Sequence, residues 1–290
     1  MMQAKSGSFD KISSTALMAA YSRQATDILY AKELAQLLKI QAVTDPLQEQ
    51  QLDVPVGLAV LTEGRYKAIN RVMAQFTLTQ ILELASGLLP RGMAMSEDPG
   101  ITFLESDLPT MISRKQKLVR QLIGERLNLH FTAIDATSRP SQFPFNADYF
   151  QQDKPVVILC EGLLMYLTLT EKKQVFANVR EVLQVYGGVW ITSDLATLDS
   201  LNPMRQDSPA PHQVVQMLDG MTGRSLKDNF FVNLDHIQQF ASEQGFLVEE
   251  YSTLNVLDQL TCLQPLGINL GAAESILAGS SVFTLTLHNV

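Results

Sequence analysis

Short apolar runs alternate with longer helical patterns along most of the chain. Seven runs have the length of strands and span residues 78–84, 101–105, 129–134, 156–160, 188–193, 246–250 and 281–287. Helical apolar spacing lies between several of them, at residues 114–124, 170–184 and 235–244. Because continuous apolar runs of this length are typical of strands covered on both faces, the alternation predicts an α/β fold with a mostly parallel sheet. We expect only a short connection between the last two runs, which would make an antiparallel pair at one edge of the sheet.

Two stretches depart from this alternation. Residues 10–75 are mainly helical in pattern, so we predict an N-terminal helical cap over residues 1–75 and an α/β domain over residues 76–290, in one compact unit. Residues 196–233 are rich in Pro, Asp, Ser, Gly and Met. A stretch of that length inside a domain usually has a function, so a lid over a binding site is favoured over a passive insertion.

Composition and charge narrow the class of protein. Of the 290 residues, 46% are hydrophobic and 18% are charged, which suffices for a sizeable core. The net charge is −8 without a basic stripe, so no nucleic-acid partner is expected. Cys160, Cys262 and the four histidines show no metal-ligand spacing. With no signal-peptide pattern and no apolar run of about 18 residues, we expect a soluble cytoplasmic protein with no metal and no membrane contact.

Residues that can carry chemistry stand where the predicted strands end. In an open α/β sheet, ligands bind beyond the carboxyl ends of the strands. Gly87 lies in the turn after the first run and allows a close approach of backbone to ligand. Asp107 lies 20 residues further on, which is the spacing typical of an acid that holds a ribose. Asp135 follows the third run, and Glu161 follows the fourth.

Each of these residues also has a simpler explanation. Asp107 could cap the next helix, and Asp135 could form a turn. Glu161 follows five apolar residues, and a carboxylate at the end of a buried strand needs a cationic partner, such as a positively charged ligand. Together, the acids and the glycine turn favour a cationic nucleoside cofactor without phosphate, because phosphates prefer glycine-rich amides away from carboxylates. S-adenosylmethionine has these properties.

Three segments together resemble the leucine carboxyl methyltransferase-like family of S-adenosylmethionine-dependent O-methyltransferases. They are Glu83-Leu-Ala-Ser-Gly-Leu-Leu-Pro-Arg91-Gly92, Leu104-Glu-Ser-Asp-Leu-Pro109 and Glu161-Gly-Leu-Leu-Met-Tyr166, in the family's order and approximate spacing. The resemblance runs from about residue 65 to residue 290. The resemblance implies a Rossmann-like class I methyltransferase sheet. Bacterial members of the family are O-methyltransferases linked to polyketide or other secondary metabolism.

The resemblance also implies roles for individual residues. Gly87 would border the methionine part of the cofactor, Asp107 with Glu105 would hold its ribose, and Asp135 with Ala136 would lie by its adenine. Further cofactor-binding positions are implied for Arg65, Glu83, Ala85, Gly162 and Glu161, the last near the methionine end.

Two residues are implied for the reaction itself. Tyr166 would face the methyl-transfer site. Arg65 resembles a family arginine that anchors a carboxylate of the cofactor or of the acceptor, although Arg71 is close in sequence. A hydroxyl acceptor needs a general base, whereas a carboxylate is already ionised at neutral pH. No histidine lies in the matching segments, although His212 could reach the site from a closed lid, so a carboxylate oriented by Arg65 or Tyr166 is favoured over a hydroxyl.

Two other functions stay open on the sequence. An NAD(P)-dependent oxidoreductase would share the sheet and the ribose acid, but no G-x-G-x-x-G opens the first helix. A non-catalytic relative could bind the cofactor or a protein partner without turnover. For an enzyme, a small-molecule acceptor is favoured over a protein C-terminus, because no segment marks a protein-docking surface.

Overall fold

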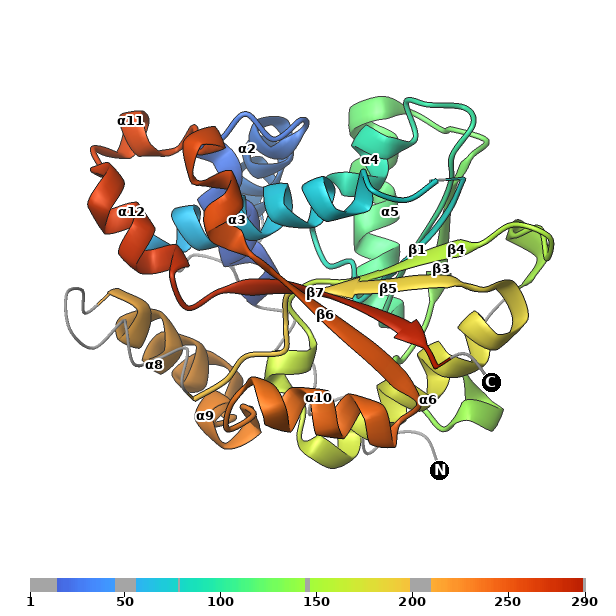
Figure 1. The fold of residues 1–290 in the computed structure, drawn as a ribbon. Coiled ribbons are helices and arrows are strands. Elements are labelled where there is room, and N and C mark those ends of the chain that lie inside the picture. Colours follow the sequence, from blue (N-terminus) through green and yellow to red (C-terminus); the bar gives the residue numbers. More distant parts are fainter. Residues whose placement is uncertain (1–14, 45–55, 78, 144–146, 199–209, 289–290) are drawn as a thin grey trace.

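Seven strands form one sheet at the centre of the protein (Figure 1). The computed structural model describes residues 15–44, 56–77, 79–143, 147–198 and 210–288. In chain order the strands are β1 (Gln80–Leu84), β2 (Thr102–Asp107), β3 (Leu129–Ala133), β4 (Val156–Cys160), β5 (Gly188–Thr192), β6 (Phe246–Ser252) and β7 (Ser281–Leu287). All seven predicted runs are strands, and the α/β class is confirmed.

The strands lie in the order β3-β2-β1-β4-β5-β7-β6. The first five are parallel, and β7 is antiparallel to both of its neighbours. The mostly parallel sheet with an antiparallel pair at one edge is therefore confirmed. The predicted short connection between the last two strands is wrong, since that segment contains η7 (Thr253–Gln259), α11 (Leu263–Leu266) and α12 (Leu270–Leu277). These helices bury apolar side chains against α3, which gives the longer connection a packing role.

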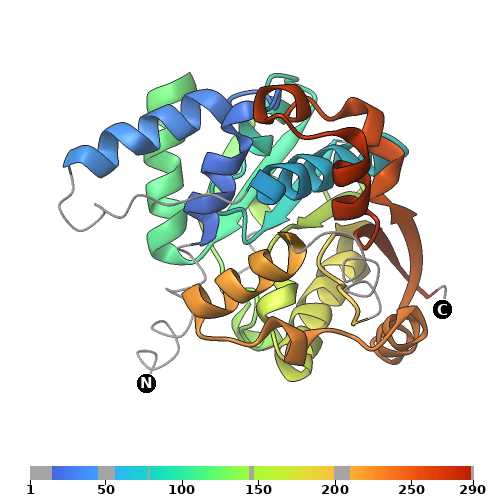
Figure 2. The same ribbon diagram turned by 90° about the vertical axis from the view of Figure 1, so that its left-hand side faces the viewer.

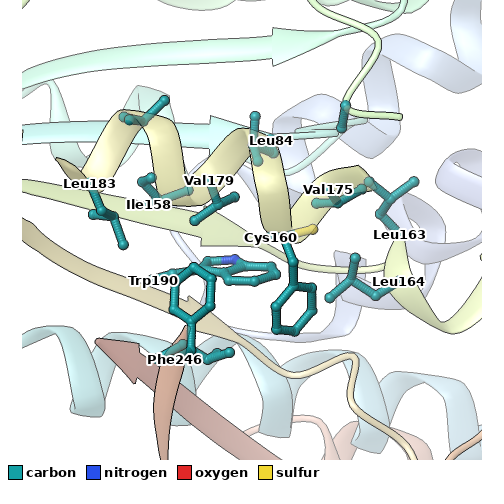
Figure 3. Close-up of a cluster of buried hydrophobic side chains, with 14 of the residues drawn as sticks. Leu84, Ile158, Cys160, Leu163, Leu164, Val175, Val179, Leu183, Trp190 and Phe246 are labelled. Carbon is teal, nitrogen blue, oxygen red and sulfur yellow. The ribbon is translucent and has the colours of Figure 1, made fainter. Parts of the chain in front are cut away.

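Helices cover both faces of the sheet, as Figure 1 shows. One face packs against α6 (Leu169–Tyr186) and α10 (Leu234–Glu243), and the other packs against α2 (Ala31–Thr44), α3 (Val56–Met73) and α5 (Pro109–Ile123). Ile158 of β4 points to the first core and Leu159 to the second, as strand alternation requires. In the first core, Trp190 packs among Val179, Leu183 and Phe246 (Figure 3).

Short elements connect these layers. They are η1 (Arg23–Ala25), α4 (Arg91–Met95), η3 (Pro140–Gln142), η4 (Ala147–Tyr149), η5 (Leu164–Tyr166), α8 (Ala210–Thr222) and α9 (Leu226–Asn229). No helix in the described ranges is long and apolar enough to cross a membrane.

Two predicted helices begin earlier than their apolar spacing indicates. Helix α6 starts from a capping box in which Thr168 and Glu171 each bind the other's backbone N–H, two residues before the predicted start. Helix α5 starts at Pro109 rather than near residue 114, because proline suits the first helical position, where its missing N–H costs nothing.

The N-terminal helical region is fastened to α3. Residues 15–22 are helical, and the hydroxyls of Ser22 and Thr62 lie 2.8 Å apart in a buried hydrogen bond. Lys67 forms ion pairs with Asp27 and Glu63 at 2.6 and 2.8 Å. These contacts hold Arg23 and Arg65 on the same side of the sheet, at the end where the parallel strands finish.

The predicted lid segment, residues 196–233, is partly helical, since α8 and α9 lie within it; residues 199–209 lie outside the described ranges. Its two ends pair with each other through Phe231, whose N–H donates to Ala196 at 2.9 Å. Asn229 donates to the Tyr166 carbonyl at 3.1 Å, and Lys172 donates to the Asn229 carbonyl at 2.7 Å. The base of the segment is therefore anchored, and closure of residues 196–233 over the site stays a prediction.

Candidate functional site

A cavity of about 410 Å³ lies beyond the carboxyl ends of the strands. Its walls come from the loops after β1 to β5, from the helix at residues 15–22, from α3 and from α8. Figure 2 shows this side of the molecule, with α8 in orange below the N-terminal helices in blue. The strand order reverses between β1 and β4, and such a switch point is where open α/β sheets bind ligands.

Most of the predicted site residues line this cavity. They are Arg65, Ala85, Gly87, Asp107, Asp135, Ala136, Glu161, Gly162 and Tyr166. The structure places Glu83 and Glu105 elsewhere, fully buried and bound to cations of the protein itself. Arg71 also points elsewhere and donates to the Asn255 carbonyl, so Arg65 is the arginine that reaches the cavity.

The turn after β1 is coupled to the acid at the end of β2. Ala85 and Gly87 both have positive φ values, +51° and +47°, which turns the chain sharply at the cavity wall. The Gly87 N–H donates to Asp107 Oδ2, and the Leu108 N–H donates to Oδ1, both at 2.7 Å. Burial raises the pKa of Asp107, and these two N–H groups oppose that effect. Each oxygen keeps a lone pair with which to accept a hydroxyl.

Asp135 shows both of its predicted features. Its Oδ1 accepts from the N–H and the hydroxyl of Thr137, at 2.9 and 2.7 Å, which is the turn-forming alternative. The residue nevertheless lines the cavity together with Ala136.

A chain of buried charges runs from the cavity into the core. Arg23 Nη2 donates to Glu161 Oε1 and Arg91 Nη2 donates to Glu161 Oε2, both at 2.9 Å. Arg91 Nη1 donates to Glu83 at 2.5 Å, and the guanidinium lies over the Tyr66 ring. Burial alone would raise the pKa of Glu161, but the positive charges of Arg23, Arg91 and Arg65 outweigh burial and hold it below its usual value. The cationic partner expected for Glu161 exists, but the protein supplies it.

A second buried pair supports the β1 turn from below. Lys115 binds the carboxylate of Glu105, and Ser86 donates to the same carboxylate at 3.4 Å. A Cβ on Gly92 would come within 2.0 Å of Glu105 Oε1, so only glycine fits beside this pair. Glu105 therefore supports the wall of the cavity and does not line it.

Asp194 is a site residue that the sequence reasoning missed. It follows β5, is buried, and accepts from the N–H groups of Gly162, Leu163 and Leu164 at 2.8, 2.7 and 3.0 Å. It thus fixes the turn that carries Glu161 and Tyr166. Its place directly after the fifth predicted strand would have revealed it, whereas no sequence signal links Arg23 to Glu161, 138 residues away.

Arg65 differs from the other charged groups of the cavity. Its Nη1 lies 4.0 Å from Met165 Sδ, and its buried Nε has no hydrogen-bond partner in the part of the chain that the structure describes. Within those same ranges it forms no ion pair. A guanidinium in this setting can receive an anion that enters the cavity.

Tyr166 stands beside this arginine in an apolar setting. Its ring packs with Met18, Leu58 and Leu218, and its hydroxyl lies 3.5 Å from Thr15 Oγ1. Burial raises the pKa of the phenol, so it stays protonated at neutral pH and can donate a hydrogen bond. His212, the other candidate for proton transfer, lies in α8 with its side chain outside the described residues.

Comparisons with solved structures identify the fold. A DUF574 family protein of Streptomyces avermitilis MA-4680 matches with a TM-score of 0.57 at 13% identity, over 95% of this chain and 97% of that one. A protein of Thermobifida fusca YX assigned as a methyltransferase matches with a TM-score of 0.54 at 15% identity, over 93% and 94%. With the strand order, these matches confirm the predicted Rossmann-like class I methyltransferase fold. A search of curated proteins finds no match.

The family follows from the sequence itself. The profile described as Leucine carboxyl methyltransferase matches residues 13–180, which is more than half of the chain. The cofactor of such a methyltransferase is S-adenosylmethionine, and the cavity fits it: Asp107 can accept a ribose hydroxyl, and Arg23 has a buried Nε without a partner among the described residues for a carboxylate. The family match favours this cofactor over the nicotinamide of the oxidoreductase alternative. The chain belongs to the leucine carboxyl methyltransferase family.

Proposed function

We propose that this protein transfers the methyl group of S-adenosylmethionine to a carboxylate oxygen of a small molecule and so forms a methyl ester. The observation that carries the proposal is Arg65, a cavity-lining guanidinium that forms no ion pair in the described part of the chain and whose buried Nε has no hydrogen-bond partner there. Its charge acts on Glu161 and Asp194 without a direct ion pair to either, so an entering carboxylate would add a charge-assisted hydrogen bond at the guanidinium. The planar guanidinium also matches the two oxygens of a carboxylate.

Methyl transfer to a carboxylate suits the groups that line the cavity. When bound, S-adenosylmethionine supplies an electrophilic methyl carbon on a sulfonium. The acceptor oxygen forms the new C–O bond as the C–S bond breaks, the electron pair stays on sulfur, and no proton moves. Arg65 and Tyr166 would hold the acceptor in line, so most of the rate comes from positioning.

A hydroxyl acceptor is the runner-up and is less well supported. It would need a general base, yet two acids of the cavity, Glu161 and Asp194, are engaged by donors of the protein itself. Glu161 is bound by two guanidinium groups, and Asp194 accepts from three backbone N–H groups. The Tyr166 phenol is held protonated by burial. A carboxylate needs none of these groups as a base.

A small acceptor suits the dimensions of the site. Pockets for small molecules typically measure roughly 300–1,000 Å³. The cavity of about 410 Å³ lies at the lower end of that range and must also hold the cofactor. We therefore favour a small acid over a protein C-terminus.

The proposal is tested by comparing phenylacetate, phenylacetamide and 2-phenylethanol as acceptors, with mass spectrometry of the products. We expect methyl phenylacetate only, and loss of that product in Arg65→Met but not in Arg71→Met, a matched arginine on the same helix that points away from the cavity. Methylation of the alcohol in place of the acid would overturn the proposal. Cofactor binding with no turnover on any acid would favour the non-catalytic alternative.

A further inference from the structure

One end of the cavity is walled by apolar side chains that the proposed chemistry does not explain. Its lining includes Met18, Leu58, Leu61, Met165, Val215, Leu218 and Phe230. All of them belong to one apolar cluster that also contains the Tyr166 ring. They come from four separate elements: the helix at residues 15–22, α3, η5 and α8, with Phe230 just after α9. We call this group the apolar chamber.

Arg65 stands at the boundary of the apolar chamber. Leu58, Leu61 and Arg65 are spaced at i, i+3 and i+7 along α3, so they share one face of the helix. The Arg65 guanidinium also lies against Met165, a member of the chamber. The charged residues of the opposite end, such as Asp107 and Asp135, follow β2 and β3 at the far side of the switch point.

We infer that the acceptor is an apolar monocarboxylic acid, with its carboxylate on Arg65 and its hydrocarbon tail in the apolar chamber. This inference rests on the proposed function and narrows its substrate class. A tail without polar groups is required because the chamber offers no charged side chain among its described members, and an unpaired polar group there would lose its hydration. The methionines among these walls are flexible and polarisable, so the chamber can adapt to tails of different shape.

The geometry makes the length of the tail a quantitative probe. Each methylene that leaves water for an apolar wall contributes about fourfold in affinity, from roughly 0.8 kcal/mol per CH₂. Butanoate, hexanoate and octanoate differ by two methylenes at each step and should therefore bind with successive gains of about 15-fold until the chamber is filled. Octanedioate has the length of octanoate but carries a second carboxylate, so it should bind at least 100-fold more weakly because that charge would be buried unpaired.

The experiment measures binding of these four acids by calorimetry to the protein saturated with S-adenosylhomocysteine. Leu218→Gln places a polar amide in the chamber wall and should weaken octanoate about tenfold while leaving butanoate nearly unchanged. Leu270→Gln, at an exposed leucine of α12, is the matched control. Arg65→Met should weaken all the monocarboxylates. Thermal melting confirms that each variant is folded. If Arg65→Met no longer binds S-adenosylhomocysteine, Arg65 anchors the cofactor and the inference is overturned.

The outcomes separate the two proposals. Octanoate binding that depends on tail length, on Arg65 and on Leu218 supports the inference. If octanoate binds in this way but is not methylated, the inference stands and only the proposed ester-forming function fails. The inference is overturned if all chain lengths bind equally, or if octanedioate binds as tightly as octanoate. The proposed ester-forming function would then still stand for polar acids. Absence of binding by every acid also overturns it.

Discussion

Two sets of buried charges meet at the same edge of the sheet, and they are completed in different ways. At the switch point, Arg23, Glu161, Arg91 and Glu83 are joined by hydrogen-bonded ion pairs, which leave Arg23 Nε and Glu83 Oε2 without a hydrogen bond among the described residues. At the same edge of the sheet, Arg65 forms no ion pair within the described part of the chain, and its buried Nε has no hydrogen-bond partner there. The first set builds the walls of the cavity, whereas the second leaves a charge for a ligand. Charge alone therefore does not mark a binding residue; the absence of a protein partner does.

The largest effect is expected from removing the centre of the paired set. Arg91→Met would leave Glu83 and Glu161 buried without their shared cation, so the free energy of unfolding should fall by about 3–5 kcal/mol. Urea unfolding measures this, and Arg71→Met, at an arginine outside the network, should change it by less than about 0.5 kcal/mol. Equal stability of the two variants would mean that the ion-pair chain does not hold the site together.

Substitution of Arg65 should lower activity strongly and stability little, which is the reverse of the effect expected for Arg91→Met. Arg65→Met should lower kcat/KM for a carboxylate acceptor roughly 10- to 100-fold, the worth of a hydrogen bond to a charged group, with little loss of stability. Steady-state kinetics and a thermal melt of the same preparation give both numbers. A variant that unfolds as readily as Arg91→Met, or one that keeps full activity, would remove the distinction between the two sets.

A smaller effect is expected from the hydroxyl beside Arg65. Tyr166→Phe keeps the ring that packs with Leu58 and Leu218 and removes only the donor. Activity should fall roughly 2- to 10-fold, as expected for one neutral hydrogen bond. Since burial holds the phenol protonated, this ratio should not vary with pH across the neutral range. A ratio that grows steeply with pH would instead indicate that the tyrosine acts as a base.

The paired set also predicts a pH dependence of stability. The pKa of Glu161 is lowered in the folded protein, so its stabilising contribution is present above its unfolded pKa, near 4.3, and is lost as the pH falls through the folded pKa. Unfolding free energies measured between about pH 6 and pH 3 should therefore fall less steeply in Glu161→Gln than in the natural protein. Parallel curves would contradict the assignment of Glu161 to this network.

The sheet and the cavity residues at the strand ends could be predicted from the sequence because both follow local rules. Apolar runs locate the strands, and the parallel arrangement brings their ends together, which is why Gly87, Asp107 and Glu161 were found. Position at a strand end could not reveal which acids face the cavity. Glu83 and Glu105 point into the core, where Arg91 and Lys115 bind them. Those partners are set by tertiary packing and not by spacing along the chain.

The apolar chamber could not be predicted from the sequence. Its members come from four elements scattered between Met18 and Phe230, and each alone resembles an ordinary core residue. Arg23 was missed for the same reason, because helix packing and not sequence proximity brings it to Glu161. Thr168 shows the local counterpart: the capping box was readable from the sequence, but the helix was predicted to start at Thr170, one residue after its first helical residue, Leu169.

The most direct test of the central claim uses an acceptor that offers both kinds of oxygen, supplied at a concentration high enough to offset the weaker binding expected for a polar phenol in the apolar chamber. The protein is incubated with 3-(4-hydroxyphenyl)propionate and S-adenosylmethionine that carries a carbon-13 methyl group, and NMR identifies the methylated oxygen. If Arg65 binds the acceptor carboxylate at the methyl-transfer site, the product is the methyl ester with the phenol untouched. Methylation of the phenol with the carboxylate left free would contradict the account.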